Sequence, residues 1–390
     1  MNAPKDKQQL ATLEDVARHA GISVATAGRA LGNYGRVSTK TRNLVLRAAR
    51  DLNYHVNALA QGMKRRSTFT VGLIVGNICN PFFSTIVRAV EATLIKRGYN
   101  LIVCDSDEDI GKEINHIRVL FQRRVDGMII SPTASPDGIA STAAKLISDR
   151  GVPFVLIDRL VPGSKAPAVL ADNIGGAFEA TNYLLRLGHR RIGIIVGRKT
   201  LDSMTARVDG YHRALASVGA AFDESLIVDG LDVGVHGGYY AAQHLLALTS
   251  PPTAIIAMNN LLVLGALNAV REKGLQIPRN ISIIGWDDFD AASHFRMPLT
   301  VVDQPASAMG TMAAEHLLQL MSGETSDQPL EILLRCSLIL RESCSALDTA
   351  KNSGITNDGA NSASSADQCN STSLAGAHTD HSALRTLGQL

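Results

Sequence analysis

The stretch ISVATAGRALGN, residues 22–33, combines small side chains with a single long cation, Arg29. Alanine, glycine and serine let a helix approach another surface closely, and a guanidinium can bond guanine O6 and N7 together. Hydroxyls hold phosphates, and small apolar side chains touch thymine methyl groups. The stretch therefore predicts a helix that reads the DNA major groove, against the alternative that Arg29 is an ordinary surface arginine. The expected DNA contacts here are Ser23, Val24, Ala25, Thr26 and Arg29.

Three short helices are expected to position these residues. Thr12 is a predicted N-cap with Asp15 three residues later, and Gly21 ends that helix. Ser23 caps the next helix, residues 24 to about 31, and Ser38 caps an amphipathic third helix that closes a small core. A helix, a short turn containing glycine and a second helix are typical of the helix-turn-helix motif.

The charge is divided unevenly along the chain. Residues 1–66 hold 12 Lys and Arg against 4 Asp and Glu, and the remainder holds 26 against 32. A basic head on a mildly acidic body favours a polyanionic partner for the head, although a solvated basic face would have the same composition.

Composition excludes several classes. The chain of 390 residues is 45% hydrophobic, which is enough for two or three domains with cores of their own. Its five cysteines are scattered without a CxxC pair, so we expect no disulfide framework and no metal site. No run of 18 apolar residues occurs, and charges stand where a signal peptide needs its apolar segment. We expect a cytoplasmic protein.

From residue 70 onward, short apolar runs alternate with segments of helical length. TVGLIVG, NLIVCD, VDGMIIS and VPFVLID form one series, and RIGIIVG, LIVDG, TAIIAMN and ISIIGWD form a second. This alternation predicts two doubly wound α/β lobes, with a ligand cleft near the carboxyl ends of their strands. We expect the first lobe at about 70–160, the second at about 161–290 with crossovers up to 346, and a disordered Ser- and Ala-rich tail at 347–390.

Several long motifs in order resemble the lactose and galactose repressor family of bacterial transcription regulators. They are TLEDVARHAGISVATAGRAL, RVSTKTRNLVLRAARDLNYHVNALAQGMK, NPFFSTIVRAVE, LGHRRIGII and IGWDDFDAASHFRMPLTVVDQP. The resemblance implies an all-α helix-turn-helix head at 12–56 after a flexible N-terminus at 1–11, a hinge helix at 57–69, and two lobes like periplasmic sugar-binding proteins. It also implies a homodimer that binds operator DNA under the control of a small effector, with no cofactor and no membrane partner.

The resemblance adds DNA contacts in the hinge. Met63 matches the leucine that the family inserts at the operator centre, and an apolar wedge of this size can open a base step; packing between two hinge helices is the alternative. The hinge residues expected to contact DNA are Asn57, Ala60, Met63 and Lys64. Gly28 stands where the family usually has serine, so one phosphate-binding hydroxyl is missing from the reading helix.

The resemblance also identifies effector positions. Arg207 matches the family's main ligand-binding arginine, and Asp287 matches its acidic partner. The expected effector contacts are Phe82, Phe83, Asp158, Arg207, Asn259, Trp286 and Asp287. Asp232, Val233 and Gly234 replace the usual aromatic platform, and Trp286 either substitutes for it or lies in the core. A sugar or sugar derivative is the first expectation; a purine or a phosphorylated metabolite stays open.

Two other classes compete with the regulator. A solute-binding protein would share the lobes but would begin with a signal peptide and lack the head. An enzyme would need a catalytic constellation, and the chain has no GxGxxG, GxxxxGK[ST], GxSxG or HExxH motif. We therefore expect no catalytic residues.

Overall fold

The computed structural model describes residues 11–32, 35–54, 67–134, 142–230, 232–294, 297–323 and 330–347. Three sets of predictions lie outside these ranges and stay predictions: those for residues 1–10, for the hinge positions Asn57, Ala60, Met63 and Lys64, and for the tail from residue 348.

The head consists of three helices, α1 (Leu13–His19), α2 (Val24–Leu31) and α3 (Thr39–Asp51). A capping box begins α1: the Thr12 N–H donates to Asp15 Oδ2 (2.9 Å) and the Asp15 N–H donates to Thr12 Oγ1 (3.2 Å). Small side chains meet at the centre, so the helices pack closely; the buried core is Val16, Ala17, Ala20, Ala27, Ala30, Val45, Ala48 and Ala49. The predicted helix-turn-helix head is confirmed.

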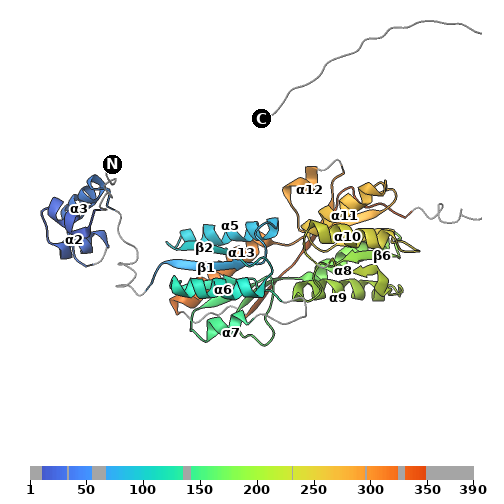
Figure 1. Cartoon of the computed structure of the whole chain (residues 1–390), viewed down its shortest axis with the longest axis horizontal. Coiled ribbons are helices and arrows are strands. Elements are labelled where there is room, and N and C mark those ends of the chain that lie inside the picture. The colour runs from blue at the N-terminus through green and yellow to red at the C-terminus, as the bar shows by residue number, and fades with distance from the viewer. Residues whose placement is uncertain are drawn as a thin grey trace, which may run out of the picture. The chain divides into compact units, whose positions relative to one another are not determined.

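The first lobe is built on a six-stranded sheet in the order β11-β5-β4-β3-β1-β2. Its strands are β1 (Thr70–Val75), β2 (Asn100–Asp105), β3 (Gly127–Ile130), β4 (Phe154–Ile157), β5 (Ala168–Ala171) and β11 (Glu331–Leu334). Its helices are α5 (Pro81–Ile95), α6 (Ile110–Gln122), α7 (Ala143–Ser148) and α13 (Ala306–Ser322). All of these strands pair in parallel, and α5 and α6 lie on opposite sides of the sheet (Figure 1). Both faces are therefore covered.

The second lobe has a sheet in the order β12-β10-β9-β8-β6-β7. Its strands are β6 (Ile192–Ile195), β7 (Ile227–Val228), β8 (Ala254–Ala257), β9 (Ser282–Trp286), β10 (Thr300–Asp303) and β12 (Ser337–Ile339). Its helices are α8 (Asn173–Arg186), α9 (Asp202–Ser217), the 3-10 turn η1 (Glu224–Leu226), α10 (Val235–Leu246), α11 (Asn260–Glu272) and α12 (Asp290–His294). The edge strand β12 pairs antiparallel with β10, and the other pairings are parallel.

The chain crosses between the lobes three times. It leaves the first lobe after β5, returns after β10 to form α13 and β11, and ends in the second lobe with β12. The first lobe thus extends to Ala171, beyond the boundary expected near residue 160. That expectation missed β5, because a run of only four residues, AVLA, does not stand out from the loop before it.

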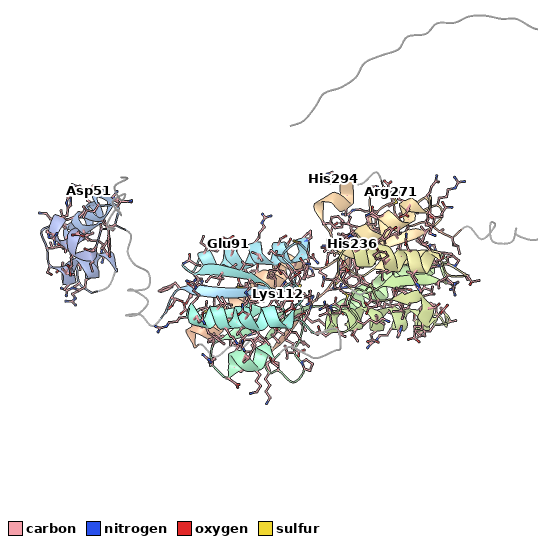
Figure 2. All side chains as sticks on the ribbon, viewed as in Figure 1. Asp51, Glu91, Lys112, His236, Arg271 and His294 are labelled. Atoms are coloured by element: carbon pink, nitrogen blue, oxygen red, sulfur yellow. The ribbon has the colours of Figure 1, made fainter. Side chains whose placement is uncertain are left out.

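Exposed charged side chains stand on the outer helices of the first lobe. Glu91 on α5 and Lys112 on α6 project away from the first sheet (Figure 2), and Lys112 Nζ lies 2.8 Å from Asp107 Oδ2. Within the part of the chain that the structure describes, no helix combines the length and the apolar character needed to cross a membrane.

Candidate functional site

Helix α2 of the head has two different faces. Ala27 and Ala30 are buried against the other helices, whereas Val24, Ala25 and Arg29 are exposed, Val24 by 43%. Ala25 and Arg29 lie on one side of the helix because positions four apart share a face, and Val24 begins the helix next to Ala25. The structure therefore places the expected base-reading residues together on an open surface.

The hydroxyls expected to hold phosphates begin this helix. Ser23 Oγ accepts a hydrogen bond from the Thr26 N–H (3.2 Å) and lies 2.9 Å from Thr26 Oγ1. The same arrangement begins α3, where Ser38 Oγ caps the Thr41 N–H (3.1 Å). Each serine hydroxyl is already used to cap its helix. A DNA phosphate would therefore have to bind beside the capped end of the helix.

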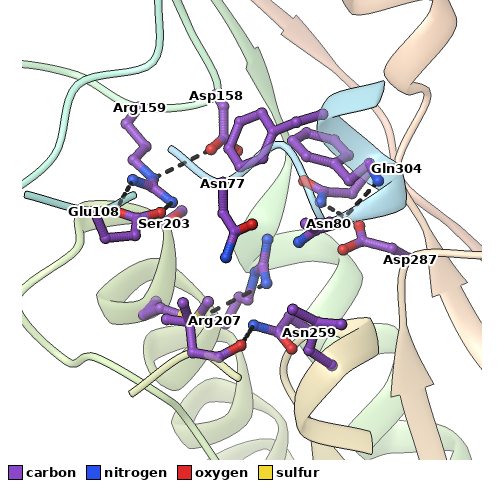
Figure 3. A pocket seen from close by; sticks show the side chains of 15 residues that line it. Asn77, Asn80, Glu108, Asp158, Arg159, Ser203, Arg207, Asn259, Asp287 and Gln304 are labelled. Atoms are coloured by element: carbon purple, nitrogen blue, oxygen red, sulfur yellow. Dashed lines mark hydrogen bonds and ion pairs between the residues drawn. The ribbon is translucent and has the colours of Figure 1, made fainter. Parts of the chain in front are cut away.

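A narrow cleft lies between the two lobes and is lined by residues of both. Loops at the carboxyl ends of strands supply most of its walls, which is the usual ligand position in parallel sheets. Its lining residues are Asn77, Asn80, Phe82, Phe83, Glu108, Asp158, Arg159, Ser203, Met204, Arg207, Val233, Asn259, Leu261, Asp287 and Gln304 (Figure 3).

Arg207 on α9 is held in place from three sides. It is only 3% exposed, its Nε donates to Asn173 Oδ1 (2.7 Å), and its Nη1 donates to the Met258 carbonyl. Its guanidinium carbon lies 4.2 Å from the centre of the Trp286 ring. A guanidinium fixed in this way presents its free edge to the cleft in one orientation.

Two buried carboxylates face Arg207 from equivalent strands of the two lobes. Asp158 follows β4 and Asp287 follows β9, and both have left-handed backbone conformations, with φ of 70° and 64°. Burial raises the pKa of Asp287 to about 6, although Arg207 and a hydrogen bond from Gln304 Nε2 (2.6 Å) oppose that shift. Burial also raises the pKa of Asp158. These carboxyl groups can accept hydrogen bonds from ligand hydroxyl or N–H groups.

Comparison with known proteins identifies the family of both parts of the chain. Residues 12–57 match the family model described as "Bacterial regulatory proteins, lacI family", and residues 68–342 match "Periplasmic binding proteins and sugar binding domain of LacI family". The chain belongs to the LacI family. It is an effector-controlled, DNA-binding transcriptional regulator, as the head and the two lobes together predict.

Relatives within the LacI family match almost over their full length. The HTH-type transcriptional repressor CytR of Escherichia coli (strain K12) is 36% identical over 344 residues, which cover 88% of this chain and 99% of that protein. The structure of the lac repressor dimer bound to operator and the anti-inducer ONPF superposes with a TM-score of 0.76 at 26% identity, covering 87% and 100% of the two chains. A complex of the regulator CelR with cellobiose has a TM-score of 0.65 at 32% identity, covering 85% and 99%.

Six of the seven effector positions predicted from the LacI resemblance line the cleft: Phe82, Phe83, Asp158, Arg207, Asn259 and Asp287. Phe82 and Phe83 form an edge-to-face pair with ring centres 5.2 Å apart. The side-chain amide of Asn259 already makes two hydrogen bonds within the protein. Its Oδ1 accepts from the Leu262 N–H (2.7 Å), and its Nδ2 donates to the Val233 carbonyl (2.9 Å).

The seventh position, Trp286, does not lie on the cleft wall. It is fully buried, and its ring stacks against the Arg207 guanidinium. The next residue along the chain, Asp287, reaches the cleft, because neighbouring side chains at a strand end point to opposite sides. Trp286 therefore does not replace the missing aromatic platform, and of the platform residues only Val233 lines the cleft.

Sequence reasoning missed an ion pair at the cleft. Arg159 Nη1 and Nη2 donate to the two oxygens of Glu108, each at 2.8 Å, and Arg159 Nε lies 3.2 Å from Asp158 Oδ2 (Figure 3). Arg159 and Glu108 are 51 positions apart, so only the position of Arg159 beside Asp158 could have indicated it. Gln304 was missed too, although it lies within the quoted motif VVDQP.

Proposed function

We propose that the protein is a homodimeric repressor that binds operator DNA and is controlled by an uncharged polar molecule, a sugar or sugar derivative first, bound in the interlobe cleft. The exposed face of α2 supports DNA reading, and the likeness to the lac repressor dimer on operator supports the dimer. The contacts proposed for DNA are Ser23, Val24, Ala25, Thr26 and Arg29 with the hinge residues Asn57, Ala60, Met63 and Lys64. The proposal includes a cytoplasmic location and no catalytic activity.

The charge of the cleft is the observation that carries the choice of effector. Its lining holds three carboxylates, Glu108, Asp158 and Asp287, and two guanidinium groups, Arg159 and Arg207. Arg159 is paired with Glu108 and Asp158, and the charges of Asp158 and Asp287 already act on Arg207. A phosphate would therefore add uncompensated negative charge to a buried site, which is costly. A ligand rich in hydroxyls instead meets acceptors and donors on both walls. The relative CelR forms a complex with cellobiose, a sugar. A phosphorylated effector is therefore disfavoured.

A purine base is the second candidate. The pair of phenylalanines Phe82 and Phe83 at the start of α5 could contact a flat ring, and Asp287 could accept hydrogen bonds from ring N–H groups. Such a ligand is also uncharged, so it fits the same charge argument.

A thermal-shift screen tests the effector class. Neutral sugars, purine bases and the phosphates of both are each added to the protein; a ligand at about 100 times its Kd stabilises the folded state by about 2.7 kcal/mol. We expect shifts from neutral compounds, and we expect Arg207→Ala to abolish them. Arg213→Ala is the matched control, since Arg213 lies on the same helix but is exposed and pairs with Asp209. Shifts produced only by phosphorylated compounds would contradict the proposal.

Binding to duplex DNA tests the other half of the function. Affinity measured by fluorescence anisotropy should fall steeply between about 50 and 200 mM salt, because Lys and Arg release counterions from phosphates. An affinity that does not depend on salt would count against operator binding.

A further inference from the structure

Arg198 joins the two lobes directly. It lies just after β6 of the second lobe, and its Nη1 donates to two main-chain carbonyls of the first lobe, those of Glu108 (2.8 Å) and Ala134 (3.1 Å). A charged donor shared by two carbonyls makes stronger hydrogen bonds than a neutral one. Arg198 does not line the effector cleft, so effector binding does not account for it.

Two buried glutamates hold these acceptors in place. The carboxylate of Glu108 is bonded by both Nη atoms of Arg159 and by Thr133 Oγ1 (3.0 Å), so the Glu108 main chain cannot move freely. The second glutamate, Glu113, accepts from the Thr133 N–H (2.8 Å), which fixes the loop that ends at Ala134. The space is tight as well, because a Cβ at Gly76 would lie 2.4 Å from Glu108 Oε1. The first lobe thus presents a preorganised pair of carbonyls to Arg198.

A second bridge lies close to the first. The Leu160 N–H, in the loop after β4, donates to Oδ2 of Asp202 at the start of α9 (2.8 Å). Residues of both bridges, Ala134, Leu160 and Asp202, line one crevice between the lobes. A third bridge, from Asn260 Nδ2 to Asn80 Oδ1 (2.8 Å), lies at the start of α5 and α11.

We propose that Arg198 and Asp202 form an interlobe clasp that sets the balance between lobe arrangements, and that Arg198 is a positioning residue for the control of DNA binding. The clasp consists of bonds between protein atoms alone, so its contribution does not depend on which effector binds. A contact that exists in one lobe arrangement and breaks in another biases the equilibrium between them. By linkage it must also change operator affinity whenever the two arrangements bind DNA differently.

The test compares Arg198→Met with Arg191→Met. Arg191 is the matched control, because it also donates to a carbonyl, that of Ser250 (2.8 and 3.1 Å), and to Asp223, but entirely within the second lobe. Hydrogen exchange of the Leu160 amide reports the clasp, because this N–H donates to Asp202 of the other lobe and loses that acceptor when the lobes move apart. Operator affinity is measured on a duplex obtained by binding-site selection with the unaltered protein.

We expect Arg198→Met to speed exchange of the Leu160 amide about tenfold and to change operator Kd at least about threefold, while Arg191→Met changes neither. Arg198→Lys keeps a cationic donor, so its Leu160 exchange rate and its operator Kd should lie between those of the unaltered protein and Arg198→Met. This variant also provides the test if Arg198→Met folds poorly. Unchanged exchange at Leu160, or unchanged operator affinity, overturns the proposal. Both measurements are made without effector. They therefore test the clasp even if the thermal-shift screen identifies no effector.

Discussion

At the scale of single residues, the cleft is organised around one guanidinium between two carboxylates. Asp158 and Asp287 occupy corresponding positions after β4 and β9, and both carry a left-handed backbone that costs free energy for a residue other than glycine. The Asp158 carboxylate lies 3.2 Å from Arg159 Nε, the Asp287 carboxylate accepts from Gln304, and both act on Arg207 through their charge. The repeated strain at matching positions is consistent with a site that must receive contributions from both lobes.

Asp287 should make stability depend on pH. With a folded-state pKa of about 6 and an ordinary value near 3.8, the folded chain keeps a proton between about pH 4 and 6 that the unfolded chain releases. Stability from this group is therefore present at low pH and is lost as pH rises through 6. Relative to Asp287→Asn, the free energy of unfolding of the unaltered protein should fall by about 1–3 kcal/mol between pH 4 and pH 7.

Denaturant unfolding at the two pH values, followed by the fluorescence of Trp286, the single tryptophan, measures this difference. Asp209→Asn is the control, because Asp209 lies on α9 with a well-exposed side chain that pairs with Arg213. The same pH dependence in the Asp287→Asn variant would show that another group is responsible.

Arg29 should contribute sequence specificity. Removing its guanidinium in Arg29→Ala should weaken operator binding by about 1–3 kcal/mol and blur the preference at one symmetric base pair, because a bidentate contact with guanine is lost. Binding-site selection with both proteins measures the preference, and effector-induced thermal shifts should stay the same. Identical consensus sequences would mean that Arg29 contacts only the DNA backbone.

Individual cleft residues could be predicted only where a linear motif marks them. Asp287 stands in the motif IGWDDFDAASHFRMPLTVVDQP, and Arg207 and Asp158 are identified by their positions in the LacI resemblance. Glu108, by contrast, belongs to the polar run SDEDI, where nothing distinguishes the buried carboxylate from its exposed neighbours. Its role depends on Arg159, 51 positions away, and such pairings follow from the fold alone.

At the scale of elements, α10 and α11 pack so closely that glycine is required where they meet. A Cβ at Gly238 would lie 2.1 Å from the Leu262 carbonyl oxygen, and one at Gly265 would lie 2.1 Å from that of Val235. This approach brings the start of α11, with its cap Asn259, against Val233 at the cleft. The glycines of HGGYY and VLGAL therefore serve the site indirectly.

Gly238→Ala should destabilise the second lobe. The added methyl group collides with main chain that cannot rotate away, and such overpacking costs about 1–3 kcal/mol. Gly111→Ala, near the start of α6, is the matched control, since its Cβ would meet only the Asp109 carboxylate at 3.1 Å. Thermal unfolding should show a lower Tm for the first variant alone; an unchanged Tm would mean that the helices can separate without loss.

Apolar runs predicted most of the strands, because central strands of a covered parallel sheet are buried on both faces. They missed three short strands, β5 inside the first sheet and the edge strands β11 and β12. These strands have three or four residues each; β11 alternates between exposed and half-buried side chains, and β12 has no buried side chain, so these two lack a continuous apolar signal. The return of α13 to the first lobe depends on contacts with α5 that are over 200 residues apart in the chain, which no local pattern encodes.

At the scale of the whole molecule, regulation requires that lobe geometry and DNA binding share one equilibrium. The cleft draws its walls from both lobes, and so does the clasp; the two share Glu108, whereas Arg198, Leu160 and Asp202 do not line the cleft. An effector and the clasp therefore act on the same lobe movement. Their effects on operator affinity should combine as free energies, with a coupling between effector and DNA of typically 1–3 kcal/mol.

The triple crossing also bears on how the protein is made. The last segments of the core, β11 and β12, complete one edge of each sheet, and both lie within residues 331–339. A ribosome releases the three-helix head early, because its contacts are local, but it must translate almost the whole core before either lobe can close. A nascent chain halted shortly before residue 331 would expose the outer edges of β5 and β10 together. Both lobes thus depend on the same late stretch of synthesis.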